Sequence, residues 1–273
     1  MARSIRPQRV NHMNAVVRDF EASIAHVEQA YGAEFMVDMP QKEFHACLFE
    51  MGRVIFELFV PWDYLVTARL GPHYVGLEWQ ADMDEVRAAL ADHGVRTVRD
   101  IGLALHTHPD DCFGVAHEFY SGEFLSRDWP LLGGGKIKSA EYWASEHPLG
   151  LTGLKGYTQV VEDIAGASAF YRSFLGAEPL FEENRAAIAG RAVGLKVADA
   201  VVELLMPTGP GWLAQRLRRQ GQGILSTVFG VADKSKARNY FVAKGVPTEE
   251  GTRPGYIAVP PEANQGIMFE FAE

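Results

Sequence analysis

Four glutamates occupy matching places in four short apolar runs of this sequence. They are Glu57 in residues 54–59, Glu118 in 115–120, Glu203 in 200–205 and Glu270 in 267–271. A carboxylate inside an apolar strand is costly to bury unless it is paired or binds a metal ion. One such residue could be an accident, but four in register predict a repeated unit that brings an acid to a fixed place.

Each acid closes a longer pattern that predicts a strand, a helix and then about three strands. An aspartate suited to cap a helix N-terminus comes first, and a glycine suited to the left-handed position ends the helix. These pairs are Asp19 with Gly32, Asp82 with Gly94, Asp163 with Gly176, and Asp233 with Gly245. Apolar residues at helical spacing lie between them, and short alternating runs follow. The predicted fold class is α+β, with four βαβββ units.

The four units fall into two pairs, separated by an irregular segment. This segment contains the run Gly133–Gly135 and the aromatic residues Trp129 and Trp143. It has no clear period, which is typical of a linker or a lid. We therefore expect a first domain at residues 8–125, a linker or lid at 126–152 and a second domain at 153–273.

Composition limits the class of partner and the compartment. The formal net charge of −9 argues against general nucleic-acid binding, which needs a basic face. No apolar run is long enough for a membrane span, and the basic start lacks the apolar region of a signal peptide. Cys47 and Cys112 do not form a disulfide framework. These features favour a cytoplasmic protein.

Paired βαβββ units with a glutamate near the end of each last strand resemble the vicinal oxygen chelate superfamily. That group includes glyoxalase I, methylmalonyl-CoA epimerase, extradiol dioxygenases and bleomycin-resistance proteins. Residues 108–119, HPDDCFGVAHEF, are similar to the final segment of the epimerases, and residues 260–271, PPEANQGIMFEF, are a second version without the histidine. The resemblance implies two tandem half-barrel domains, with metal ligands on the first and last strands of each unit.

The resemblance places His12, Glu57, His73 and Glu118 at the metal positions of the first domain. Two imidazoles and two carboxylates suit a divalent ion such as Zn, Ni, Co, Mn or Fe. His73 lies two residues from Val75, where the family pattern has its second histidine. A shift of two residues keeps a side chain on the same strand face, so His73 remains the expected ligand.

Glu57 and a further residue, His45, are expected to take part in catalysis. His45 lies near the position of a catalytic carboxylate in the epimerases, where an imidazole could move a proton. Glu57 occupies a position that is Glu in glyoxalase I and often Gln in the epimerases. A fourth ligand, here a carboxylate, favours Lewis-acid chemistry over oxygen activation, which needs vacant positions on a redox-active metal.

Other residues are expected to lie outside the centre. His117 should point to the strand face opposite Glu118, and His106 and His108 should belong to the turn before that strand. In the second domain Gly156 stands where His12 would, and Ser226 or Ile224 stands where the second histidine would. We therefore expect the second domain to be a degenerate copy that keeps Glu203 and Glu270 without a metal.

The predicted function is that of a metal-dependent isomerase, epimerase or lyase. It would act on a small oxygenated molecule through a metal-stabilised enolate. One alternative is a ring-cleaving dioxygenase with Fe(II) on His12, His73 and Glu118. Another is a non-catalytic binding or resistance protein that sequesters a ligand in the concave sheet. Units of this kind pair within and between chains, which allows a homodimer.

Overall fold

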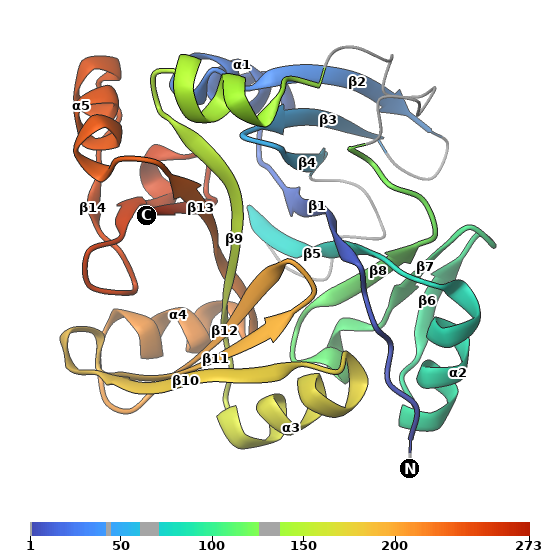
Figure 1. Cartoon of the computed structure of the whole chain (residues 1–273). Coiled ribbons are helices and arrows are strands. Elements are labelled where there is room, and N and C mark those ends of the chain that lie inside the picture. The colour runs from blue at the N-terminus through green and yellow to red at the C-terminus, as the bar shows by residue number, and fades with distance from the viewer. Residues whose placement is uncertain (1, 42–44, 61–70, 126–136) are drawn as a thin grey trace. The chain divides into compact units, whose positions relative to one another are not determined.

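The structure, a computed structural model, describes residues 2–41, 45–60, 71–125 and 137–273. In these residues the chain forms two sheets of eight strands, together with helices (Figure 1). Residues 126–136 of the expected linker, which include Trp129 and Gly133–Gly135, lie outside the described residues.

The first sheet combines the first two repeat units in the order β2-β3-β4-β1-β5-β8-β7-β6. Its strands are β1 (Arg9–Val16), β2 (Glu34–Pro40), β3 (His45–Met51), β4 (Val54–Phe59), β5 (His73–Gln80), β6 (Thr97–Asp100), β7 (Ala104–Thr107) and β8 (Ala116–Tyr120). Strands β1 and β4 are parallel and place Asn14 opposite Glu57. Strands β5 and β8 are also parallel and place Glu78 opposite Glu118.

The second sheet repeats this order with the counterpart of every strand, β10-β11-β12-β9-β13-β16-β15-β14. Its strands are β9 (Leu151–Val160), β10 (Glu178–Arg185), β11 (Gly190–Val197), β12 (Ala200–Pro207), β13 (Gly223–Val231), β14 (Glu249–Glu250), β15 (Ile257–Val259) and β16 (Met268–Ala272). Parallel pairing places Thr158 opposite Glu203 and Val228 opposite Glu270. The matching order and register confirm the predicted α+β fold of four βαβββ units.

Each repeat unit has its expected helix after the first strand. These helices are α1 (Phe20–Tyr31), α2 (Met83–His93), α3 (Ile164–Phe174) and α5 (Lys234–Lys244). The predicted aspartates accept hydrogen bonds from backbone N–H groups of the first turn, as Asp82 does from Asp84 and Glu85. The glycines after the helices have positive φ, for example 64° at Gly32. The capping signals therefore set both ends of these helices.

Some helical segments were not expected from the sequence. Helix α4 (Trp212–Gln220) joins β12 to β13. Short turns of helix form η1 (Pro109–Cys112), η3 (Tyr142–Glu146), η4 (Ala186–Ile188) and η5 (Pro261–Ala263). None of the helices in the described ranges combines the length and the apolar character that a membrane span requires.

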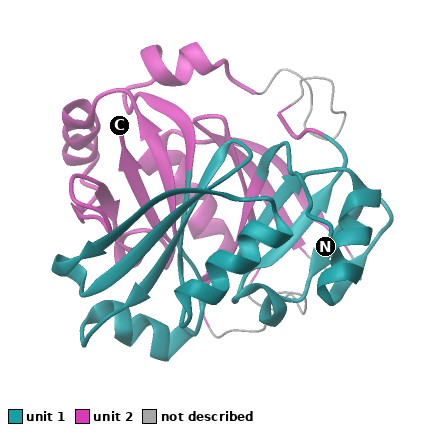
Figure 2. Cartoon of the chain, turned by 60° about the horizontal axis from the view of Figure 1, so that its bottom comes forward, with its two compact units in different colours: residues 1–11, 75–122, 156–225 teal, residues 12–74, 123–155, 226–273 magenta. Residues whose placement is uncertain are grey.

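The chain divides into two compact units, each of which contains three separate segments (Figure 2). The first unit holds residues 1–11, 75–122 and 156–225, and the second holds 12–74, 123–155 and 226–273. Each unit thus takes one repeat from each sheet. The sheets follow the two halves of the sequence, whereas the compact units do not. The domain boundaries at 8–125, 126–152 and 153–273 stay a prediction.

Each compact unit has an aromatic core of its own. In the first unit, Trp79, Tyr171 and Phe174 are fully buried. In the second unit, the rings of Phe56 and Phe229 stack with centroids 5.8 Å apart. Aromatic side chains bury a large apolar area, which is the main source of stability in such cores.

The described part of the expected linker is packed into the second unit. Trp143 in η3 is fully buried, and its Nε1 donates to Oε1 of Glu50 at 2.7 Å. The same carboxylate accepts from the backbone N–H groups of Arg53 at 3.0 Å and Lys138 at 3.1 Å. Burial raises the pKa of Glu50, although these donors oppose the shift. Residues 137–147 are therefore held by a buried carboxylate.

Candidate metal centre

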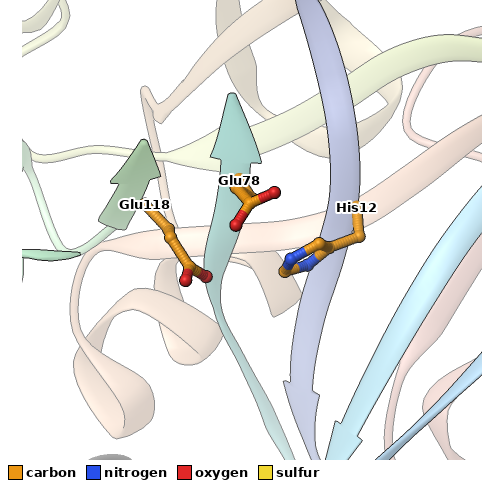
Figure 3. A group of neighbouring side chains, drawn as sticks. All are labelled: His12, Glu78 and Glu118. Carbon is orange, nitrogen blue, oxygen red and sulfur yellow. The ribbon is translucent and has the colours of Figure 1, made fainter. Parts of the chain in front are cut away.

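Three buried side chains form a group that could hold a metal ion. They are His12 on β1, Glu78 on β5 and Glu118 on β8, and one potential ligand atom from each lies within 4.8 Å of the others. Their residues are 2%, 2% and 8% exposed, respectively. Figure 3 shows the three side chains converging from their strands. One imidazole and two carboxylates make a donor set that suits a divalent transition metal.

The two carboxylates of the group belong to the first compact unit. Because β5 and β8 pair in parallel, Glu78 and Glu118 face each other in register. Two like charges directly opposite each other in a buried sheet are destabilising, and a cation between them removes that penalty. The residues present therefore fit a metal ion better than they fit an empty site.

Each carboxylate has a polar side chain against it. Nδ2 of Asn11 donates to Oε1 of Glu78 at 2.9 Å and to the carbonyl oxygen of Gly122 at 2.9 Å. Nε2 of His106 lies 3.1 Å from Oε2 of Glu118, directly across the β7–β8 pair. His106 lies within β7 and not in the turn expected from the sequence, because that turn begins two residues later, at His108.

His12 is fixed by its neighbours in the second compact unit. Its Nδ1 lies 2.6 Å from Oδ1 of Asn14, two residues further along β1. The same nitrogen is 3.9 Å from Oε2 of Glu57. The imidazole also lies against the ring of Phe124, with centroids 4.8 Å apart.

The group contains two of the four ligands expected from the sequence, His12 and Glu118. Glu57 is buried and lies near His12, but it is outside the three-residue group. His73 is not brought to the group either. It begins β5, with Nδ1 2.8 Å from the carbonyl oxygen of Gly71. Five residues of strand, roughly 16 Å, separate it from Glu78.

Glu78 is the residue that sequence reasoning missed. On β1, Asn14 lies opposite Glu57, and His12 comes two residues before it. On β5, Glu78 lies opposite Glu118, so the position equivalent to His12 is Gly76. A Cβ atom at Gly76 would lie only 1.7 Å from the carbonyl oxygen of Ala116, so no side chain fits there. The acid stands two residues further on, on the same strand face. The signal in the sequence was a single acid in the apolar run 73–79.

His45, expected to move a proton, is placed away from Glu57. Its Nε2 lies 2.7 Å from Oδ1 of Asp38, and its ring is 4.9 Å from that of Phe20. On β3 it is Leu48 that lies opposite Glu57. His45 comes three residues before Leu48, so strand alternation turns it to the other face of the sheet.

His117 lies on the opposite face from Glu118, as strand alternation predicts. It is fully buried, and its Nδ1 accepts a hydrogen bond from Nε1 of Trp79 at 3.1 Å. Its Nε2 is 3.3 Å from the hydroxyl of Tyr171, which donates to Oε1 of Gln159 at 2.6 Å. Burial lowers the pKa of His117 to about 3. This imidazole belongs to the core of the first unit.

In the second half of the chain, the first acid is paired with an internal cation. Arg185 donates through Nη1 and Nη2 to the two oxygens of Glu203, at 2.6 and 2.5 Å. The hydroxyl of Thr158 is 3.3 Å from the same carboxylate. At Gly156, the position equivalent to His12, a Cβ atom would lie 1.9 Å from the carbonyl oxygen of Val201. Arg185 thus neutralises Glu203, and Gly156 supplies no imidazole where the first half has His12.

The second acid of that half is held by hydrogen bonds. Glu270 is fully buried and accepts from the hydroxyl of Ser226. It also accepts from the N–H of Thr252 at 2.5 Å and from its hydroxyl at 2.9 Å. Among the described residues, the one cluster of side chains that could hold a metal ion is that of the first sheet. The two halves of the chain therefore use equivalent glutamates in different ways.

Comparison with known proteins supports this fold. The model of the Glyoxalase/Bleomycin resistance protein/Dioxygenase superfamily matches residues 153–271. A mutant 4-hydroxymandelate synthase from Streptomyces coelicolor has 12% identity and a TM-score of 0.76, over 97% of this chain and 92% of that chain. The 2,3-dioxygenase LapB from Pseudomonas sp. KL28 has 14% identity and a TM-score of 0.65, over the same shares of the two chains.

A further likeness covers less than half of the chain. Methylmalonyl-CoA epimerase from Mycobacterium tuberculosis has 24% identity over 44% of this chain and 87% of that chain. Its TM-score is 0.42. No curated protein matches the sequence. The two full-length likenesses, at low identity, show the fold and not the reaction.

Proposed function

We propose that this chain is a member of the Glyoxalase/Bleomycin resistance protein/Dioxygenase superfamily, also called vicinal oxygen chelate. We further propose that it is a metal-dependent enzyme acting on a small oxygenated molecule. The observation that carries the proposal is the buried group of His12, Glu78 and Glu118. Two buried carboxylates in register repel each other, a cation would relieve that repulsion, and the donor set matches a divalent ion such as Mn, Fe, Co, Ni or Zn. Tandem βαβββ units place these side chains on rigid strands.

The proposed reaction is an isomerisation, epimerisation or lyase step beside a carbonyl group. A divalent ion held by His12, Glu78 and Glu118 would act as a Lewis acid and stabilise an enolate. Glu57 is the proposed base, because it is a buried carboxylate 3.9 Å from His12 and could take a proton from the carbon beside the carbonyl. His45 is left out of this proposal, since it faces the other side of β3.

The ligand set favours this chemistry over oxygen activation. Non-haem Fe(II) oxygenases use two histidines and one carboxylate. The group observed has one histidine and two carboxylates. A ring-cleaving dioxygenase is therefore the alternative reaction that the test must exclude, and a ligand-sequestering protein is the alternative without catalysis.

Elemental analysis of the purified full-length protein is the first experiment. We expect one divalent ion per chain, which His12→Ala should abolish. His45→Ala is the matched control, since the same residue type is removed from the other face of the sheet, and it should keep the ion. A wild-type protein that takes up no metal, or a His12→Ala variant that keeps it, would refute the proposal.

The reaction class is tested with the metal-loaded protein. Solvent deuterium should enter the carbon beside a carbonyl in small oxo acids or thioesters, and Glu57→Gln should slow this exchange by a factor of about 10²–10⁴. The exchange is followed by NMR. Bound iron together with oxygen uptake in the presence of catechols would show instead that the dioxygenase alternative is correct.

A further inference from the structure

We infer that Asn11, Asn14 and His106 are positioning residues, and that each orients one ligand of the proposed metal. Asn14 contacts His12, Asn11 contacts Glu78 and His106 contacts Glu118. The inference rests on the proposed function and deepens it. Partners of this kind fix the rotation and the tautomer of metal ligands, and their loss weakens metal binding.

Asn14 fixes the tautomer of the histidine. It follows His12 by two residues on β1, so both side chains lie on one face of the strand. Oδ1 of Asn14 is 2.6 Å from Nδ1 of His12, and both residues are 2% exposed. An amide oxygen can only accept, so Nδ1 must carry the proton. The lone pair of the neutral ring is then on Nε2, a nitrogen that metals bind.

His106 fixes one carboxylate from the neighbouring strand. It lies opposite Glu118 in the antiparallel β7–β8 pair, with Nε2 3.1 Å from Oε2. Its side chain is 21% exposed, while that of Glu118 is 10% exposed. An imidazole N–H that donates to a carboxylate restricts its rotation. The acid and its partner thus come from two strands held in register by the sheet.

Asn11 fixes the other carboxylate. Its Nδ2 donates both to Oε1 of Glu78 and to the carbonyl oxygen of Gly122, each at 2.9 Å. Two bonds from one amide nitrogen orient the whole side chain, which is 3% exposed as a residue. The contact also links the start of β1 to the segment directly after β8.

The second half of the chain supports a role specific to the metal centre. By strand register, the counterpart of Asn14 is Thr158 and the counterpart of His106 is Ala258. The glutamates Glu203 and Glu270 remain in that half. The half without a histidine ligand therefore also lacks these two partners, although its sheet has the same order and register. A part needed only for folding the sheet would be expected in both halves.

The test measures Mn²⁺ affinity of the full chain by titration calorimetry, with the electron paramagnetic resonance spectrum of the bound ion as a second readout. Asn14→Leu and His106→Ala should each weaken binding about 10–100-fold. Asn14→Asp and His106→Gln keep an acceptor and a donor, respectively, and should restore most of the affinity. His108→Ala, two residues away in sequence and outside the centre, is the control and should bind as the wild type does.

The outcomes separate this inference from the proposed function. Unchanged affinity in both Asn14→Leu and His106→Ala, with binding still lost in His12→Ala, would overturn the inference and leave the proposed metal centre intact. A wild-type chain that binds no Mn²⁺ or other divalent ion would overturn both. Equal loss in His106→Ala and His106→Gln would also contradict a positioning role, since the conservative variant keeps the donor.

Discussion

Replacing Arg185 with Met should cost the first compact unit much of its stability. The guanidinium donates to both oxygens of Glu203 and also to Oε1 of Glu183, at 2.8 and 3.0 Å. The side chains of Arg185 and Glu203 are 3% and 8% exposed. Met fills a similar volume but leaves the Glu203 carboxylate buried without its cation.

The size of the effect follows from that burial. Removing one partner of a buried ion pair costs about 3–5 kcal/mol, because the remaining charge has lost its compensation. Glu183 is partly exposed and can turn to water, so its contribution is small. For a protein of this size each kcal/mol lowers the melting temperature by about 2–4 °C. We therefore expect a decrease of roughly 6–20 °C.

Thermal unfolding at pH 7, followed by circular dichroism, measures the difference. The matched control is Arg191→Met, since Arg191 pairs with Glu182 one strand away and both side chains are exposed, 42% and 60%. A surface pair of this kind contributes about 0–1 kcal/mol. The double variant Arg185→Met with Glu203→Leu should recover most of the loss, because an apolar pair replaces a buried ionic one.

A decrease of melting temperature in Arg185→Met no larger than that in Arg191→Met would refute the reasoning. So would a double variant that is less stable than Arg185→Met alone. Either result would mean that Glu203 finds other compensation when the guanidinium is removed.

The remaining predictions concern a close backbone approach and a buried imidazole. Gly76→Ala should lower the free energy of unfolding by about 1–3 kcal/mol or more, because the added Cβ clashes with the Ala116 carbonyl. Gly211→Ala is the control and should leave the stability unchanged, since the space around Gly211 is open. Equal midpoints of urea unfolding for the two variants would contradict this. Burial, then the charge of Lys236, lowers the pKa of His147 to about 4 from 6.5. The unfolded chain binds the proton first as the pH falls, so stability present above pH 6.5 is lost between 6.5 and about 4. Between pH 6.5 and about 4 the melting temperature of His147→Asn should fall less than that of the wild type. An equal fall in both proteins would show that protonation of His147 does not cause the loss of stability.

Local signals in the sequence predicted the repeat and its helices. Asp19 and Gly32 mark the ends of α1 because a capping side chain and a left-handed glycine act within a few residues. The regular recurrence of one glutamate per unit predicted that one βαβββ unit is repeated four times. Helix α4 carries no comparable aspartate, since Gly211 is its N-cap, and it was not expected.

The metal group was harder to predict because strand faces depend on single residues. Asn14, opposite the first glutamate, lies five residues before Asp19, but Glu78, opposite the second, lies four before Asp82. If the position of the second histidine on β5 is counted back from the capping aspartate, it is therefore wrong by one residue. An error of one residue places the side chain on the opposite face of the strand. The same limit applies to His45, whose position was inferred across a loop.

Local signals in the sequence do not predict interactions between distant segments. Nothing near Glu203 in sequence indicates that Arg185, on another strand, would pair with it. The composition of the compact units is also non-local, because residues 75–122 pack with 156–225 although they belong to different sheets. Such packing depends on the complementarity of whole faces, which a periodic pattern does not specify.

The interleaving of the compact units sets an order for folding during synthesis. When residue 150 has been made, every strand of the first sheet exists, yet neither compact unit is complete (Figure 2). The first unit has all its segments once residue 225 has emerged, and the second must wait for residues 226–273. At about 5–20 residues per second this delay is roughly 2–10 s. For that time Phe56 on β4 lacks its packing partners Phe229 and Phe269, so apolar surface of the second unit stays uncovered.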